Sequence, residues 1–224
     1  MTQQFDLFDS GTAPEAALFD SIQLADASLS LVRSFASVEH RVRWFEQLID
    51  VTPWTQDNIV MFGRTMKVPR LSAWHGNADA GYTYSNIDLV PLPWNAPLLE
   101  IKALIEPLVG VVFNSVLVNL YRDGADSVAW HADDEPELGA EPVIASVSLG
   151  ATRTFKLKHQ TDSSLRHSME LVDGNLLIMQ GRTQQCWMHA VPKRAKAVGP
   201  RINLTFRTVR AVRGGDGSPG ATQE

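Results

Sequence analysis

The stretch SVAWHADDEPE, residues 127–137, places a histidine and an aspartate two positions apart, as His131 and Asp133. Residues two apart in an extended chain project to the same side, so both side chains can reach one metal ion. A third ligand is available in MHAVP, where His189 ends an apolar stretch. Two histidines and one carboxylate hold Fe(II) on one face and leave positions open for oxygen and a co-substrate, whereas similar ligands also bind zinc with a water. A polar surface turn is the third interpretation, and the motif alone does not decide among them.

The segment RINLTFR, residues 201–207, predicts a strand with one apolar and one polar face. Its two arginines, Arg201 and Arg207, would lie about 20 Å apart at roughly 3.3 Å per residue. In the mouth of a barrel they can hold both ends of a short dicarboxylate, because guanidinium groups make paired bonds to carboxylate. A strand half exposed to water is the alternative. If the barrel is correct, the arginines favour Fe(II) with a chelating 2-oxoacid over zinc.

The neighbouring segment SVLVNLY, residues 115–121, alternates in the same way. Val116, Val118 and Leu120 form its apolar face. Asn119 and Tyr121 lie together on the opposite face, as Asn203 does on the arginine strand.

The elements that must position these residues change from helices to strands near residue 114. Apolar spacing predicts helices over 39–49 and 97–109, with Gly110 placed to end the second. Many short strands favour a jelly roll or sandwich over a parallel α/β sheet, so the fold class is mainly β with flanking helices (α+β). The expected strands are 115–121, 143–149, 152–158, 167–172, 175–180, 185–189 and 201–209.

The bulk properties indicate a soluble, reduced protein with local rather than overall basic charge. The chain has 224 residues, one cysteine (Cys186) and no apolar run long enough to cross a bilayer, which predicts a cytoplasmic protein. The net charge of −5 comes from residues 1–32, which contain five acids and no base. Basic residues cluster at 61–70 and at 192–201, where they can contact phosphates or simply be solvated. We expect a flexible acidic tail over 1–30 and a disordered Gly-rich tail over 211–224.

Four segments together resemble the AlkB family of Fe(II)- and 2-oxoglutarate-dependent nucleic-acid dealkylases. They are NLYRDGADSVAWHADDEPEL, PVIASVSLGATRTFKLKH, MHAVP and PRINLTFR, and the resemblance covers about residues 55 to 209. It implies a double-stranded β-helix, a form of jelly roll, over 113–210. Helices and an N-terminal base-recognition lid would occupy 31–112.

The same resemblance assigns roles to the polar residues of the strands. His131, Asp133 and His189 would ligate iron, with 2-oxoglutarate and oxygen as co-substrates. Arg207 and Asn119 would approach the iron-side carboxylate of 2-oxoglutarate. Arg201 and Tyr121 would bind its far carboxylate, and Asn203 would brace the pocket.

The segments MFGRTMKVPR and GYTYSN resemble the lid of the duplex-DNA-repair branch. Extruding a base from the stack costs a few kcal/mol, so the wedge Phe62 would fill the gap it leaves. Tyr84 would stack on the base opposite His131, Tyr82 would line the pocket, and Glu135 would read the polar edge of the base. Aromatic faces and an acid favour a cationic lesion such as N1-methyladenine or N3-methylcytosine. The implied reaction is oxidative dealkylation in DNA, coupled to 2-oxoglutarate decarboxylation to succinate and releasing formaldehyde.

Two other functions and one further partner are compatible with the sequence. The alternatives are a 2-oxoglutarate-dependent oxygenase acting on RNA or protein, and a nucleic-acid-binding jelly roll with a structural zinc. The start of the chain resembles a short sliding-clamp-binding peptide through Gln4, Phe5, Leu7 and Phe8, although so short a motif also arises by chance. We expect a monomer.

Overall fold

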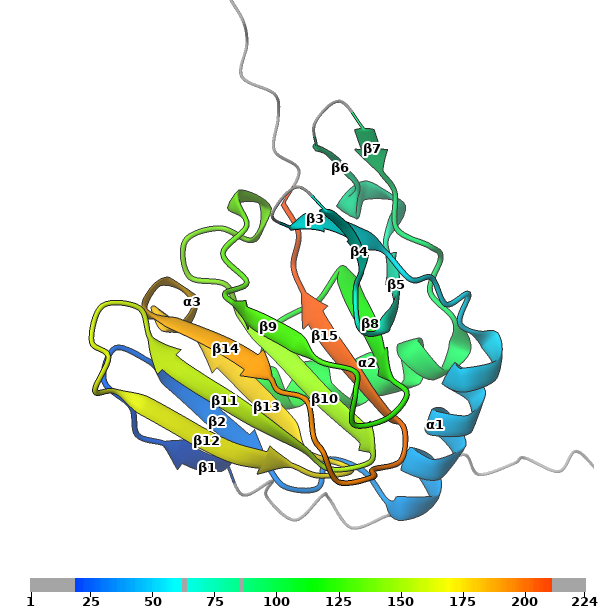
Figure 1. The fold of residues 1–224 in the computed structure, drawn as a ribbon. Coiled ribbons are helices and arrows are strands. Elements are labelled where there is room, and N and C mark those ends of the chain that lie inside the picture. Colours follow the sequence, from blue (N-terminus) through cyan, green and yellow to red (C-terminus); the bar gives the residue numbers. More distant parts are fainter. Residues whose placement is uncertain (1–18, 62–63, 85–86, 211–224) are drawn as a thin grey trace, which may run out of the picture.

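Two antiparallel β-sheets facing each other form the body of the protein in the computed structural model, which describes residues 19–61, 64–84 and 87–210 (Figure 1). Within these residues, the large sheet has seven strands: β1 (Phe19–Ile22), β2 (Ser28–Val32), β13 (Leu176–Gln180), β10 (Ile144–Gly150), β15 (Arg201–Arg207), β8 (Ser115–Tyr121) and β5 (Leu71–Gly76). The small sheet has four: β12 (Arg166–Leu171), β11 (Arg153–His159), β14 (Trp187–Val191) and β9 (Val128–His131). This arrangement confirms the predicted jelly roll.

Alternation along β15 decides which side chains enter the space between the sheets. Ile202, Leu204 and Phe206 are fully buried in the core shared with the helices. Arg201 points the other way, into the space between the sheets, and is only 1% exposed. The strand half exposed to water is therefore wrong, because the second sheet covers the polar face.

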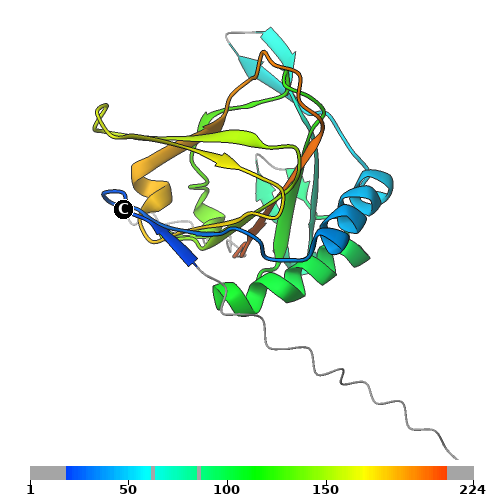
Figure 2. The ribbon, with the colours of Figure 1, turned by 90° about the horizontal axis from the view of Figure 1, so that it is seen from below.

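Two helices cover the outer face of the large sheet, as Figure 2 shows in the view from below. Ser37 is the N-cap of helix α1 (Val38–Val51), whose buried residues are Trp44 and Leu48. Asn95 is the N-cap of helix α2 (Ala96–Val109), and its side chain accepts a hydrogen bond from the backbone N–H of Leu98. It ends at Gly110, which has a left-handed φ of 73°. Both helices were predicted, and no helix in the described ranges is long and apolar enough to span a membrane.

The remaining elements lie at the ends of the barrel. Two hairpins stand above it, β3 (Asn58–Met61) with β4 (Arg64–Lys67) and β6 (Tyr82–Tyr84) with β7 (Ile87–Leu89). One short helix, α3 (Thr183–Cys186), precedes β14, in place of the start of the strand expected over 185–189. Two 3-10 turns complete the described chain: η1 (Ala78–Ala80) and η2 (Pro136–Leu138).

The structure corrects the expected boundaries at the N-terminal side. A flexible tail over 1–30 is wrong for residues 19–30, because β1 and β2 extend the large sheet and β2 pairs with β13. The alternating sequence SLSLV buries Leu29 and Leu31 against the small sheet. Likewise β5 pairs with β8, so the region 31–112 contributes a strand to the barrel. The tails predicted over residues 1–18 and 211–224 lie outside the described residues.

Candidate metal centre

The three predicted metal ligands meet at one end of the small sheet. His131 ends β9 and is the cross-strand partner of His189 on β14, while Asp133 follows two residues later. One carboxylate oxygen of Asp133 lies 4.0 Å from His131 Nε2, and the other lies 3.9 Å from His189 Nε2. Ligand atoms of all three residues lie within 4.8 Å of one another. A polar surface turn is excluded, because Asp133 is buried.

Neighbouring groups fix how each ligand faces the site. His131 Nδ1 donates to the carbonyl of Ala129 at 2.9 Å, which leaves Nε2 free to bind a metal. The backbone N–H of Asp133 donates to the side-chain oxygen of Gln184 at 3.0 Å. The ring of Phe155 stacks on His189 with centroids 5.2 Å apart. The three ligands are thus oriented by contacts from β9 itself, from α3 and from β11.

The electrostatics of the site favour the protonation states that a metal requires. Burial lowers the pKa of His189 from 6.5 to about 4, so its ring is neutral at neutral pH. Burial by itself would raise the pKa of Asp133, but the positive charge of Arg207, 3.3 Å away, holds that pKa below its usual value. A neutral imidazole and an ionised carboxylate are the forms that coordinate a divalent cation.

The two arginines of β15 occupy opposite ends of the inner space. Arg207 Nη2 lies 3.3 Å from Asp133, and its Nη1 lies 3.6 Å from Glu135. Arg201 donates to the Ser148 hydroxyl at 2.9 Å and lies against the Tyr121 ring, yet its Nε and Nη1 have no hydrogen-bond partner among the described residues. Unsatisfied buried donors on a cation are costly. This end of the barrel therefore fits a carboxylate.

The asparagines predicted for the pocket lie between these two ends. Asn119 and Asn203 are cross-strand partners on β8 and β15. Asn203 donates to the Ser146 hydroxyl at 2.8 Å and to the carbonyl of Val147 at 3.0 Å, which braces β15 against β10. Both line an inner cavity of about 50 Å³ together with Tyr121 and the three metal ligands.

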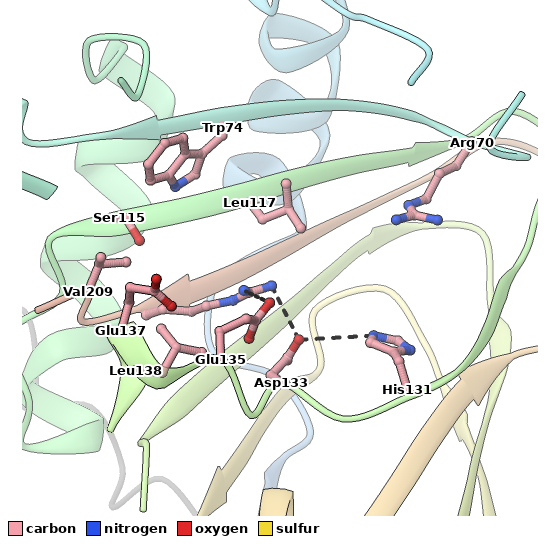
Figure 3. Close-up of a pocket in the computed structure, with 11 residues that line it drawn as sticks. Arg70, Trp74, Ser115, Leu117, His131, Asp133, Glu135, Glu137, Leu138 and Val209 are labelled. Carbon is pink, nitrogen blue, oxygen red and sulfur yellow. Dashed lines mark ion pairs between the residues drawn. The ribbon is translucent and has the colours of Figure 1, made fainter. Parts of the chain in front are cut away.

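A larger cavity of about 310 Å³ opens above the inner one, and Figure 3 shows side chains in its wall. The two cavities share five lining residues, including His131, Asp133 and Arg207. Glu135, for which a contact with the base is predicted, lines the outer cavity. The metal ligands thus lie at the boundary between a closed interior and an opening to the surface.

Sequence reasoning missed several residues that shape this site. Arg70, assigned to a basic loop, points inward instead: its Nε donates to the Asn119 side chain at 2.8 Å, and it lines both cavities. Gln184 was not singled out either. Arg153 is 1% exposed and donates to the carbonyls of Asp123, Asp126 and Pro192. A signal for Arg153 was present, since it shares the inward face of β11 with Phe155 and Leu157.

The predicted basic cluster over 192–201 also needs correction. Arg201 does not belong to it, because the small sheet covers this side chain. The surface members that remain are Lys193, Arg194 and Lys196.

The predicted base-recognition residues are only partly within the described structure. Tyr82 and Tyr84 lie on β6, next to the barrel opening, and the structure describes their backbone alone. Phe62 lies outside the described residues. Their roles stay predictions.

A third cavity, of about 650 Å³, lies beside His131 between β4 and the small sheet. Its wall includes Trp130, which is 38% exposed, and the lysines Lys67, Lys156 and Lys193. The ammonium of Lys158 lies 4.8 Å from the Trp130 ring centroid. This groove offers an aromatic face and positive charge next to the metal ligands.

Comparisons with known proteins agree with this geometry. The family model of the 2OG-Fe(II) oxygenase superfamily matches residues 28–207. Alpha-ketoglutarate-dependent dioxygenase alkB homolog 3 of Homo sapiens is 42% identical over 88% of this chain and 74% of its own. DNA oxidative demethylase ALKBH2 of Arabidopsis thaliana is 38% identical over 89% and 71%, and that of Homo sapiens is 35% identical over 82% and 73%. The solved structure of OsALKBH1 shares the fold, with a TM-score of 0.63 at 16% identity, covering 85% of this chain and all of that one.

Proposed function

Because the chain belongs to the AlkB family of the 2OG-Fe(II) oxygenase superfamily, we propose that it removes alkyl groups oxidatively from damaged bases in DNA. The observation that carries the proposal is the pairing of two sites within one barrel. The first is the His131–Asp133–His189 group. The second is Arg201, whose two buried donors have no partner among the described residues. A metal group alone would also suit zinc. The buried guanidinium adds the requirement for an anionic co-substrate.

The residues of the barrel divide the binding of the co-substrates among them. His131, Asp133 and His189 would hold Fe(II), Arg207 and Asn119 would approach the iron-side carboxylate of 2-oxoglutarate, and Arg201 and Tyr121 would hold the far one. When bound, iron with 2-oxoglutarate and oxygen supplies the oxidation that converts an N-methyl group to formaldehyde and 2-oxoglutarate to succinate and carbon dioxide. The inner cavity limits the access of bulk water to this chemistry, because most of its lining residues are buried.

The surroundings of the metal ligands support a nucleic-acid base as the substrate. The groove beside His131 has lysines suited to phosphates and an exposed tryptophan suited to stacking. Glu135 places a carboxylate in the outer cavity, where it would attract a cationic base such as N1-methyladenine or N3-methylcytosine. Tyr84 would stack on the extruded base and Tyr82 would line its pocket, while Phe62 would fill the gap that the base leaves in the duplex. ALKBH2 relatives carry the name DNA oxidative demethylase.

The decisive test uses an oligonucleotide that carries one N1-methyladenine, with mass spectrometry of the product. We expect the methyl group to be lost only when Fe(II), 2-oxoglutarate and oxygen are all present. Asp133→Asn should lower the rate by more than about 100-fold, because it removes the charge that binds the metal. Asp134→Asn, at the exposed neighbour, is the matched control and should retain activity.

The same assay separates this proposal from its alternative. Methylated RNA of the same sequence is added in competition with DNA, and both products are weighed. Turnover of 2-oxoglutarate with RNA or protein substrates but with no repair of DNA would contradict the proposed substrate. Full activity of Asp133→Asn would contradict the metal assignment.

We also propose that the segment containing Gln4, Phe5, Leu7 and Phe8 binds the sliding clamp of the replication machinery. Its support is the sequence, since these residues lie outside the described part of the chain. Tethering to a clamp would raise the local concentration of the enzyme on DNA.

A further inference from the structure

The inner space of the barrel contains a second buried arginine besides Arg201. Arg153 is the first residue of β11 in the small sheet, whereas Arg201 is the first residue of β15 in the large sheet. Each residue is 1% exposed. Among the described residues, the ion pairs of arginines involve neither of these two side chains. Two buried cations without a carboxylate partner are costly, unless an anionic ligand completes the site.

Both guanidinium groups lie over the ring of Tyr121, at the end of β8. The guanidinium carbon of each arginine is 5.3 Å from the ring centroid. A cation within about 6 Å of an aromatic face is attracted to it, and more strongly where water is excluded, as around this ring, which is 2% exposed. Burial lowers the pKa of Arg201 most, and the positive charge of Arg153 lowers it as well. Tyr121 and the two arginines therefore form one buried cluster that joins the sheets.

The other contacts of Arg153 fix its position but do not neutralise its charge. Its Nη1 donates to the carbonyl of Asp123 at 3.1 Å, and its Nη2 donates to the carbonyls of Asp126 and Pro192 at 2.7 and 2.8 Å. Its Nε has no hydrogen-bond partner among the described residues. Carbonyl oxygens accept the protons but carry no full charge. The guanidinium is thus held firmly against the ring while its positive charge stays available to an anion.

From these contacts we propose that Arg153 is a positioning residue for 2-oxoglutarate. It holds the ring of Tyr121 in place, so that the phenol hydroxyl is available to the far carboxylate that Arg201 binds. Its charge adds to that of Arg201, so this end of the barrel favours a co-substrate with a second carboxylate. The inference rests on the proposed roles of Arg201 and Tyr121, and it does not depend on DNA as the substrate.

Calorimetry with two 2-oxoacids tests this role without turnover. The full-length protein is loaded with Mn(II) in place of iron and titrated with 2-oxoglutarate or with pyruvate, which lacks the far carboxylate. We expect Arg153→Gln to weaken the binding of 2-oxoglutarate by about tenfold and to leave that of pyruvate unchanged. A distorted metal site would weaken both by the same factor. The ratio of the two affinities therefore reports on the far end of the barrel alone.

Arg153→Lys keeps the test decisive if loss of the three carbonyl contacts prevents the glutamine variant from folding. Lysine retains the charge and can donate to the carbonyls, but it has no planar group to lie on the ring. The binding of 2-oxoglutarate should therefore still weaken by about threefold. Tyr121→Phe removes the hydroxyl, and in that background Arg153→Lys should have no further effect, because both changes act on the same group.

Arg122→Gln is the matched control. Arg122 holds the same turn by donating to the Asp126 carboxylate at 2.8 and 2.9 Å, whereas the cations found over the Tyr121 ring in the described structure are Arg153 and Arg201. This variant should leave the affinity ratio unchanged.

Three results would overturn the inference while leaving the proposed co-substrate site intact. They are a ratio that falls as far in Arg122→Gln as in Arg153→Lys, a wild-type ratio in both Arg153 variants, and effects of Tyr121→Phe and Arg153→Lys that simply add. A wild type that binds both acids equally would contradict the proposed roles of Arg201 and Tyr121, and the role of Arg153 with them.

Discussion

Single residues with buried charge determine which ligands the barrel accepts. Within the described part of the chain, two buried donors of Arg201 have no hydrogen-bond partner, a cost that an anionic ligand would remove. Arg207 lies against Asp133 and lowers the pKa of that carboxyl group, so it keeps the carboxylate ionised for metal binding. The same guanidinium would also bind a second anion. The two arginines therefore have different roles, although the sequence presents them as equivalent.

The Arg201→Lys variant tests the first of these roles. Lysine retains the charge but loses the planar fork, so we expect KM for 2-oxoglutarate to rise by about 10- to 100-fold while kcat at saturation changes little. Succinate formation at increasing 2-oxoglutarate measures both constants. Arg166→Lys, on the exposed edge strand β12, is the control. An unchanged KM in Arg201→Lys would exclude this residue from co-substrate binding.

His75 makes stability depend on pH. Burial lowers its pKa, although its Nδ1 donates to the carbonyl of Pro93 at 2.7 Å. In the unfolded chain the His75 ring takes up a proton near pH 6.5, whereas in the folded protein burial disfavours the protonated ring. The free energy of unfolding should therefore fall as pH drops below that value. Denaturant titrations from about pH 7 to about pH 5 measure the fall. The His75→Asn variant keeps a donor toward Pro93 but cannot titrate, so its loss of unfolding free energy over this pH range should be smaller. Equal losses in the variant and the wild type would contradict this account.

At the scale of elements, the pairing of β8 with β15 sets the inner wall of the site. Their register places Tyr121 opposite Arg201 and Asn119 opposite Asn203, so the polar faces of both strands form one surface. Helices α1 and α2 pack on the apolar faces of the same strands. A shift of one residue in this register would turn the arginines toward the helices.

Gly150, at the end of β10, shows how tightly the helices pack on the large sheet. Its φ is 83°, and a Cβ there would lie 2.7 Å from the Phe45 ring and from the Pro200 carbonyl oxygen. Gly110 has a similar φ of 73°, and a Cβ there would have no atom of the described residues within 4 Å. Gly110→Ala should therefore cost about 1 kcal/mol of unfolding free energy, and Gly150→Ala about 2–4 kcal/mol. Equal losses of unfolding free energy in the two variants, measured by thermal or denaturant unfolding, would show that Phe45 and α1 move aside at no cost.

At the scale of the whole molecule, the site exists because two sheets close over each other. His131 and His189 come from the small sheet, whereas Arg201 and Arg207 come from the large one. The hairpins β3–β4 and β6–β7 stand at the open end, and β4 lines the groove that contains Trp130. In the proposed function, metal, co-substrate and substrate would thus meet at the open end of the barrel.

The clamp-binding proposal also concerns the molecule as a whole, because it links the barrel to a partner on DNA. A peptide of residues 1–12 should bind the clamp in calorimetry, and the same peptide with Leu7→Ala and Phe8→Ala should not, since the apolar anchors are lost. Absence of binding at high micromolar peptide would end the proposal.

The sequence by itself determined the features that depend on local periodicity. The His131–Asp133 spacing, the alternation around Asn203 and the end of α2 at Gly110 follow from strand and helix geometry, and the structure confirms them. The family resemblance supplied His189 as the third ligand, which local spacing could only suggest.

Only the tertiary structure decided the contacts between distant segments. Arg70 turns inward because Asn119, across the β5–β8 pair, accepts its hydrogen bond. Leu31 becomes part of a sheet because β13 offers it a partner, and Asp26 meets His159 and Cys186 because the sheets close. Such contacts depend on pairings between strands far apart in the chain, and hydrophobic patterning within one strand contains no information about them.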